Sequence, residues 1–126
     1  MGCDCNDERL ELVIKQGEQR SYSFTIKDKT GTPVDLSSST IEVQVKNYPL
    51  YKVNSILTMP LNRESSENGQ ITDPTNGKFV LTITEEQSSS LVPKEYYLII
   101  TMITGTNRVI ISGEGQASGV LVVCKQ

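Results

Sequence analysis

The 126-residue sequence contains no histidine and no tryptophan. Histidine is the side chain that most often moves protons near neutral pH, and it is also the commonest imidazole metal ligand. Without it, a nucleophile and its base could be assembled only through unusual lysine chemistry, so we expect that the protein is not an enzyme. The absence of tryptophan weakens any surface on which sugars or bases would stack.

Cysteine is also scarce, with Cys3, Cys5 and Cys124 as its three occurrences. An odd count argues against a closed disulfide framework. A structural zinc site needs four ligands, and no histidine can complete a set with these thiols. We therefore expect no bound metal and no other cofactor, and we interpret residues 1–8 as a flexible N-terminal tail.

Long apolar runs are missing as well. The longest, residues 96–100 and 120–124, have the size of strands, whereas a bilayer span needs about 20 residues. The N-terminus has no basic segment followed by an apolar stretch, which indicates synthesis in a cytoplasm without a secretory signal.

Positive charge is neither abundant nor clustered. The net charge is −3 at pH 7, which gives no long-range attraction to nucleic acid or anionic membranes. The basic residues Arg9, Lys46, Lys52 and Arg63 are scattered over separate segments and form no basic stripe. We expect neither nucleic acid nor a membrane as a partner.

What the sequence does contain is alternation with a period of two. Tyr22, Phe24 and Ile26 alternate with small polar residues, and Ile41, Val43 and Val45 repeat this pattern after a Gly/Pro turn. Such alternation is typical of a sheet with one buried and one solvated face. The strands that we expect on this basis cover residues 9–15, 20–28, 40–46, 51–59, 78–84, 95–104, 109–112 and 119–125.

Short strands without a long helix predict an all-β protein, an immunoglobulin-like antiparallel β-sandwich of seven to nine strands. Residues 9–126 are expected to form this single domain. One short helical turn is predicted near residues 84–91, because Thr84 precedes Glu85, Glu86 and Gln87. Leu91 is expected to anchor this turn in the core.

Residues 95–104 are apolar on both faces, which is typical of a central strand or of a strand covered by a partner. Tyr96 or Tyr97, placed after the helical turn, is expected to act like a tyrosine corner, whose hydroxyl binds upstream backbone. Residues 60–77 contain only Ile71 as an apolar residue between Leu61 and Phe79, and they predict a long exposed excursion. Such a segment is either a binding or assembly loop or a mobile loop without a role.

Paired acids are the only residues that suggest catalysis. Glu85 with Glu86, or Glu11 with Glu18, could serve as the two carboxylates of a glycoside hydrolase. Adjacent acids at a helix start are far more often partners of the helix dipole, which is the interpretation we prefer.

Asp28, Asp35 and Asp73 could bind calcium, which prefers oxygen ligands. Their spacing matches no EF-hand or repeat, and the chemistry of turns explains all three. We therefore assign no catalytic, cofactor-binding or metal-binding residue.

The order of the motifs resembles a known family. The sequence has YSFTI at 22–26, KDKTGTPVDL at 27–36, GKFVLTIT at 77–84 and IISG at 110–113. This ordered set resembles the immunoglobulin-like domain of bacteriophage tail and baseplate proteins, especially the N-terminal domain of baseplate upper proteins. The resemblance covers residues 10–123. Thr30-Gly31 stands where members typically have Asp-Gly or Asn-Gly.

The resemblance implies a structural or assembly protein of a phage or prophage tail or baseplate. Such a protein would be made in the bacterial cytoplasm and reside in the virion. Its partners would be other tail and baseplate proteins and copies of itself, as a trimer or a larger oligomer. The alternative is an extracellular module that recognises carbohydrate or a host surface, with Tyr48 and Tyr51 as contact residues.

Overall fold

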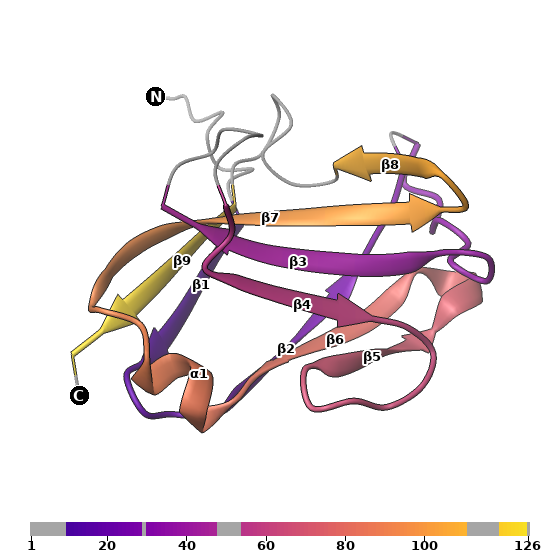
Figure 1. Ribbon diagram of the computed structural model, residues 1–126. Helices are drawn as coiled ribbons and strands as arrows, with labels where there is room; N and C mark the ends of the chain where they lie inside the picture. The colour runs from indigo at the N-terminus through magenta and orange to yellow at the C-terminus, as the bar shows by residue number, and fades with distance from the viewer. Residues whose placement is uncertain (1–9, 29, 48–53, 111–118, 126) are drawn as a thin grey trace.

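Two β-sheets face each other in the computed structural model (Figure 1). A cluster of buried apolar side chains lies between them. The structure describes residues 10–28, 30–47, 54–110 and 119–125. Nine strands lie in this part of the chain: β1 (Leu10–Lys15), β2 (Arg20–Thr25), β3 (Thr40–Lys46), β4 (Leu57–Leu61), β5 (Gly69–Asp73), β6 (Lys78–Ile83), β7 (Lys94–Thr104), β8 (Asn107–Ile110) and β9 (Gly119–Cys124). These strands confirm the all-β sandwich of seven to nine strands.

The larger sheet has the order β1-β9-β7-β3-β4, and β8 pairs with the end of β7. β1 and β9 are parallel, whereas the other pairs are antiparallel. The smaller sheet has the order β2-β6-β5 and is antiparallel throughout. β7 lies between β3 and β9, which confirms residues 95–104 as a central strand.

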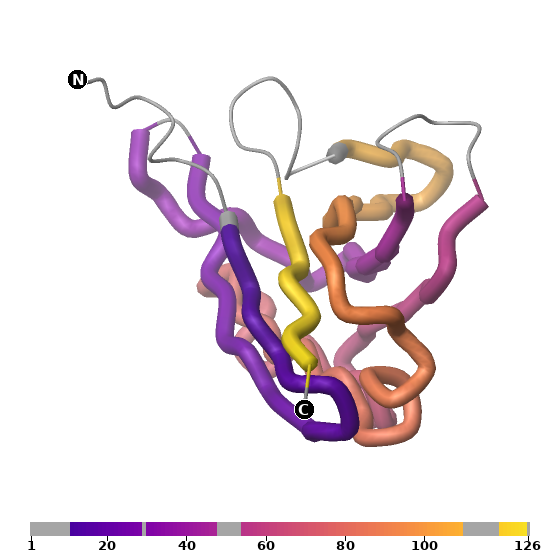
Figure 2. The backbone as a smooth tube through the Cα atoms, turned by 90° about the vertical axis from the view of Figure 1, so that its left-hand side faces the viewer, coloured from indigo at the N-terminus to yellow at the C-terminus, as the bar shows by residue number. Residues whose placement is uncertain are grey.

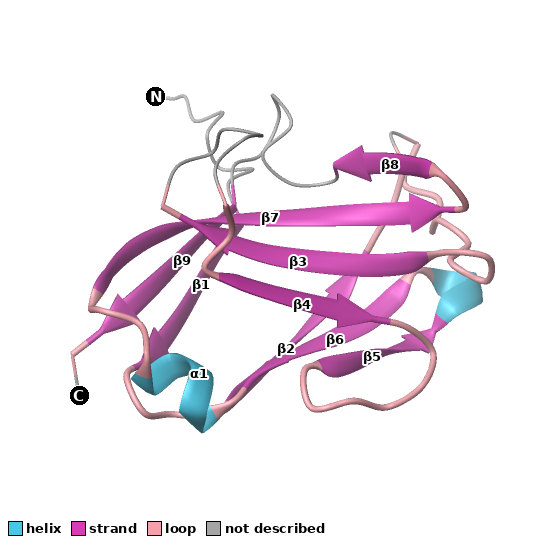
Figure 3. Ribbon diagram, viewed as in Figure 1, coloured by secondary structure: helices cyan, strands magenta, loops and turns pink. Residues whose placement is uncertain are grey.

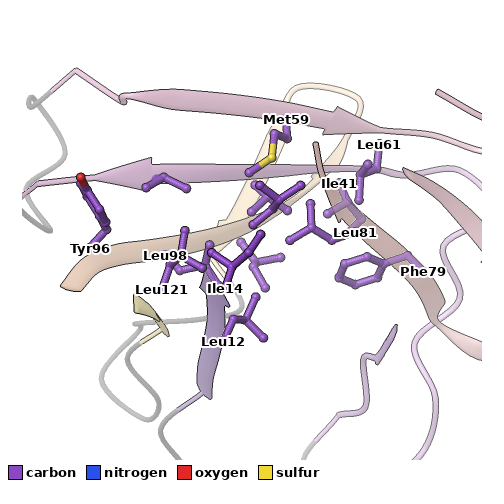
Figure 4. Close-up of a cluster of buried hydrophobic side chains, with 14 of the residues drawn as sticks. Leu12, Ile14, Ile41, Met59, Leu61, Phe79, Leu81, Tyr96, Leu98 and Leu121 are labelled. Atoms are coloured by element: carbon purple, nitrogen blue, oxygen red, sulfur yellow. The ribbon is translucent and has the colours of Figure 1, made fainter. Parts of the chain in front are cut away.

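Alternation decides which side chains form the core. In β3, Ile41, Val43 and Val45 are buried while Glu42 and Gln44 are partly exposed. β6 repeats this pattern, and its inward residues meet those of the larger sheet (Figure 4). The most completely buried side chains are Phe79, Ile14, Leu36, Ile41, Met59, Leu61, Ile71, Leu81, Ile83, Leu91, Leu98 and Leu121.

The predicted helical turn is present as α1 (Glu85–Ser89), drawn in cyan in Figure 3. The Thr84 hydroxyl accepts a hydrogen bond from the Gln87 amide at 3.2 Å, and the Gln87 side chain accepts one from the Thr84 amide at 3.0 Å. This reciprocal capping box satisfies amides that a helix start leaves without partners. Leu91 follows the helix and is 1% exposed, as expected. No helix of the described residues is long and apolar enough to cross a membrane.

The prediction of a long exposed excursion over residues 60–77 is wrong. β4 extends to Leu61, β5 occupies Gly69–Asp73, and a short 3-10 helix follows at Pro74–Asn76. Ile71 is 2% exposed and belongs to the core. β5 buries so few apolar side chains that its sequence shows no clear alternation. Pro60 is tolerated in β4 because β4 is an edge strand.

Several residues singled out in the sequence lie outside the described part of the chain. They are Cys3, Cys5, Arg9, Tyr48, Tyr51 and Lys52.

Candidate functional site

The outer face of the larger sheet, meaning the side turned away from the core, carries an apolar cluster at one end. In the register of the strands, Val13 lies opposite Val122, and Val120 lies opposite Tyr97. Val13 and Tyr97 are each 39% exposed. We call Val13, Val120, Val122 and Tyr97 the apolar cluster. Val120 is only 5% exposed, and the exposed Glu11 and Glu95 lie opposite Val120 and Val122 on the same face.

The apolar character continues along β7 beyond this cluster. Ile99 and Ile103 project from the same side as Tyr97, because alternate residues of a strand share a face. Glu42 and Arg108 then form an ion pair on this face. Exposed apolar side chains with polar neighbours are common at interaction sites.

The edge of β1, next to this cluster, is closed by side chains. The Val13 carbonyl accepts hydrogen bonds from the Tyr22 hydroxyl at 2.8 Å and from Arg20 Nη1 at 3.1 Å. The Lys15 amide donates to the Glu18 carboxylate at 2.9 Å. Burial, as the largest cause, raises the pKa of Tyr22 to about 12, so its hydroxyl remains a donor at neutral pH. β1 is therefore poorly placed to receive another strand.

Two further edges are also closed or interrupted. The Ile71 amide of β5 donates to the Asn62 carbonyl at 2.6 Å, and Gln70 Nε2 donates to the Arg63 carbonyl at 2.8 Å. The segment after β4 thus covers the outer side of β5. At the edge of the larger sheet, Pro60 gives β4 one backbone position without a donor.

The structure does not bring the predicted carboxylates into a catalytic arrangement. Glu85 and Glu86 occupy the first turn of α1 and line an open concavity of about 540 Å³ together with polar side chains only. A carboxylic acid that donates protons near neutral pH needs an apolar pocket, which this concavity does not offer. Glu11 is exposed on β1, while the Glu18 carboxylate accepts the Lys15 amide.

The three aspartates considered for calcium serve separate turns. The Asp28 carboxylate accepts bonds from the Thr30 hydroxyl at 2.7 Å and from the Thr32 amide at 3.0 Å, which lower its pKa. The hydroxyl and amide of Ser37 likewise lower the pKa of Asp35.

The Asp73 carboxylate accepts a bond from Asn76 Nδ2 at 2.9 Å. Within the described residues, no three side chains of histidine, cysteine, aspartate or glutamate gather in a group that could hold a metal ion.

Of the four basic residues considered in the sequence, Lys46 and Arg63 lie in the described part of the chain. Lys46 is 5% exposed, and Arg63 lines a concavity of about 410 Å³ beside the Ser37–Thr40 segment and Ile103. The described lining of this concavity contains no aromatic side chain, so it offers no ring for a sugar to stack on.

The fold defines a small β-sandwich protein whose larger sheet exposes Val13 and Tyr97 on its outer face. No protein family model matches the sequence, and no curated protein matches it. Among solved structures, the chain is similar to the N-terminal domain of phage TP901-1 ORF48, with a TM-score of 0.46 and 13% sequence identity. The similarity covers 93% of this chain and 85% of that chain. A likeness of this size does not by itself assign a family or a function.

Proposed function

We propose that the protein is a non-enzymatic structural or assembly protein of a bacteriophage or prophage tail or baseplate, which acts by docking onto other proteins. We infer the docking surface from the apolar cluster, in which Val13 and Tyr97 are both 39% exposed. The assignment to a phage tail rests on the ordered motifs at 22–36, 77–84 and 110–113.

Docking at the apolar cluster would be driven by removal of apolar surface from water. Each buried Å² contributes about 25 cal/mol, and tyrosine is among the residues that most often dominate interface energies. β7 is well suited to present such residues, because β3 and β9 hold it on both sides. Tyr97 and Ile99 are therefore displayed on a rigid sheet rather than on a loop.

The partners in this proposal are other tail or baseplate proteins and identical copies, in a trimer or a larger oligomer. The place of action is the virion. The proposal includes no turnover; the open polar concavity beside the paired acids of α1 and the lack of histidine in the sequence support this part of it.

The proposal is tested on particles released from the bacterial strain that carries the gene. Mass spectrometry of purified particles and immunogold labelling should place the protein at the tail. Val13→Lys puts a charge into the apolar cluster and should reduce incorporation at least about tenfold, because a desolvated unpaired charge opposes binding.

Thr72→Lys is the matched control, since Thr72 is exposed on the smaller sheet, away from the apolar cluster. This variant should be incorporated like the wild type. Absence of the protein from particles would overturn the proposal. Equal incorporation of both lysine variants would overturn the role of the apolar cluster.

A further inference from the structure

The edge of β2 presents backbone groups without partners. The Ile26 amide donates to the Gly77 carbonyl at 2.9 Å, which continues the register of β2 and β6. In an antiparallel pair, hydrogen-bonded residues alternate with residues whose N–H and C=O groups point away from the partner strand. Ser21, Ser23 and Thr25 are the latter kind, so their backbone groups point to the outer edge.

This edge is exposed and unprotected. Ser21, Ser23 and Thr25 are all exposed, and within the described chain no hydrogen bond of their backbone groups toward this edge is found. Natural proteins normally protect edges with proline, bulges, lysine or a covering segment. β1 is closed by Tyr22 and Arg20, and β5 by the segment after β4, yet β2 has none of these devices along 21–25. Figure 2 shows β2 at one margin of the molecule.

We propose that β2 pairs with β2 of a second copy of this chain, antiparallel and centred on Ser23. In this register Ser23 lies opposite Ser23 of the second copy, and Ser21 lies opposite Thr25 of the second copy. All three exposed residues then exchange both backbone groups, which no register shifted by two residues achieves. The two three-stranded sheets become one continuous sheet.

The side chains of β2 favour this occupant over a strand of unrelated sequence. On the inner side, Tyr22 lies opposite Phe24 of the second copy, and both rings are only partly buried in the single chain. Aromatic pairs across antiparallel strands are stabilising. Phe24 already stacks on Phe79 with ring centroids 4.9 Å apart, so its ring has a fixed position. Arg20 lies opposite Ile26 of the second copy, and like charges do not meet within β2.

Such a contact is isologous, because the same surface is used by both copies, and it therefore closes at two copies. It is distinct from the apolar cluster on the larger sheet and does not depend on the proposed function. A trimer or larger oligomer would need a different surface. An edge of six residues is smaller than a standard interface, so the dimer should be weak.

The oligomeric state of the full chain tests the pairing. Sedimentation velocity from about 1 μM to about 1 mM protein, with reducing agent, should show a concentration-dependent dimer. Ser23→Pro removes a donor at the two-fold axis from both copies, and it should weaken the dimer about tenfold or more. Ser23→Lys places like charges opposite each other and should act in the same direction.

Thr72→Lys adds the same charge to the opposite edge strand of the same sheet and should leave the dimer unchanged. Ser23→Lys retains the backbone donor, so it keeps the test valid if Ser23→Pro fails to fold. A chain that stays monomeric up to about 1 mM would overturn the inference.

Residue-resolved amide exchange locates the interface. The amides of Ser21, Ser23 and Thr25 should gain protection as protein concentration rises. Those of Tyr22 and Phe24, which bond to β6, should be protected at all concentrations. A dimer without this gain in protection would also overturn the inference. A monomer that is still incorporated into tails would refute the pairing and leave the proposed function intact.

Discussion

The hydroxyl of Tyr96 donates a hydrogen bond of 2.8 Å to the carbonyl oxygen of Val92, four residues upstream. The Tyr96 side chain is 4% exposed, so this bond is made largely away from water. It fixes the start of β7 to the segment that follows α1. Of the two tyrosines that the sequence offered for this role, Tyr96 performs it, while Tyr97 projects from the outer face.

Replacement of Tyr96 by phenylalanine tests how much the hydrogen bond to the Val92 carbonyl contributes to stability. Tyr96→Phe keeps the ring but leaves the Val92 carbonyl without its donor, which should lower the free energy of unfolding by about 1–1.5 kcal/mol. Urea denaturation followed by circular dichroism measures the change. Tyr97→Phe, at the exposed neighbouring position, should stay within about 0.5 kcal/mol of the wild type. Equal losses in the two variants would contradict the role given to Tyr96.

Ser88 connects α1 to the turn between β1 and β2. Its side chain is fully buried, and its hydroxyl donates to the Glu18 carbonyl at 2.7 Å and accepts from the Gly17 amide at 3.0 Å. Ser88→Ala leaves both backbone groups without a partner and should cost about 2 kcal/mol in the free energy of unfolding. Thermal and urea unfolding check this value.

The adjacent Ser89 is the natural control for Ser88, because it is exposed on the same helix. Ser89→Ala should change stability by no more than about 0.5 kcal/mol. A Ser88→Ala variant as stable as Ser89→Ala would mean that water replaces the lost hydroxyl.

Local alternation was sufficient to predict most strands. The predicted strand 40–46 has the same bounds as β3, and the predicted strand 78–84 matches β6, in which Phe79, Leu81 and Ile83 are buried. These strands have one buried and one solvated side, so apolar and polar residues alternate in their sequence with a period of two. The capping box at Thr84 was predictable for a similar reason, because all its partners lie within four residues.

The excursion over 60–77 and the sheet edges could not be predicted in the same way. β5 is held by pairing with β6 and by the bond from Ile71 to Asn62, which depend on how the chain folds back. The parallel pairing of β1 with β9 joins opposite ends of the sequence, and local pattern contains no information about it.

The apolar cluster was partly predictable. The two apolar faces of residues 95–104 already indicated an outer face that a partner could cover. That Val13 lies on the same face as Tyr97 could be known only once the order of the strands in the sheet was known. The closure of the β1 edge by Tyr22 could likewise not be predicted from the sequence, because it depends on how the two sheets approach each other.

At Gly69 the backbone of β6 leaves no room for a side chain on β5. Its φ is +121°, and an added Cβ would lie 1.9 Å from the Val80 carbonyl oxygen. Gly69→Ala should therefore cost about 3 kcal/mol or more, since both the backbone angle and the contact are unfavourable. Gly31→Ala is the control for the angle alone, because Gly31 has a φ of +88° with nothing within 4 Å of an added Cβ. This control should lose only about 1 kcal/mol in urea unfolding, and equal losses would show that the contact is relieved.

The bond from Tyr22 to Val13 should make stability depend on alkaline pH. Burial raises the pKa of Tyr22 from 10.0 to about 12, so between these values the unfolded chain releases the phenolic proton before the folded chain does. The unfolded state then binds fewer protons, and the free energy of unfolding falls as pH rises through this window. The contribution of Tyr22 is complete below pH 10 and lost near pH 12.

The comparison with Tyr22→Phe separates the contribution of Tyr22 to the pH dependence from the contributions of the other tyrosines. At pH 8 the variant should be less stable by about 1 kcal/mol, because the Val13 carbonyl loses a donor. The difference should shrink as the pH is raised from 10 toward 12, by about 1 kcal/mol after allowance for the partial exposure of the ring. Urea midpoints of both proteins at matched pH values measure this difference. A difference that stays constant across the window would show that the Tyr22 phenol has the same pKa in the folded and unfolded chains.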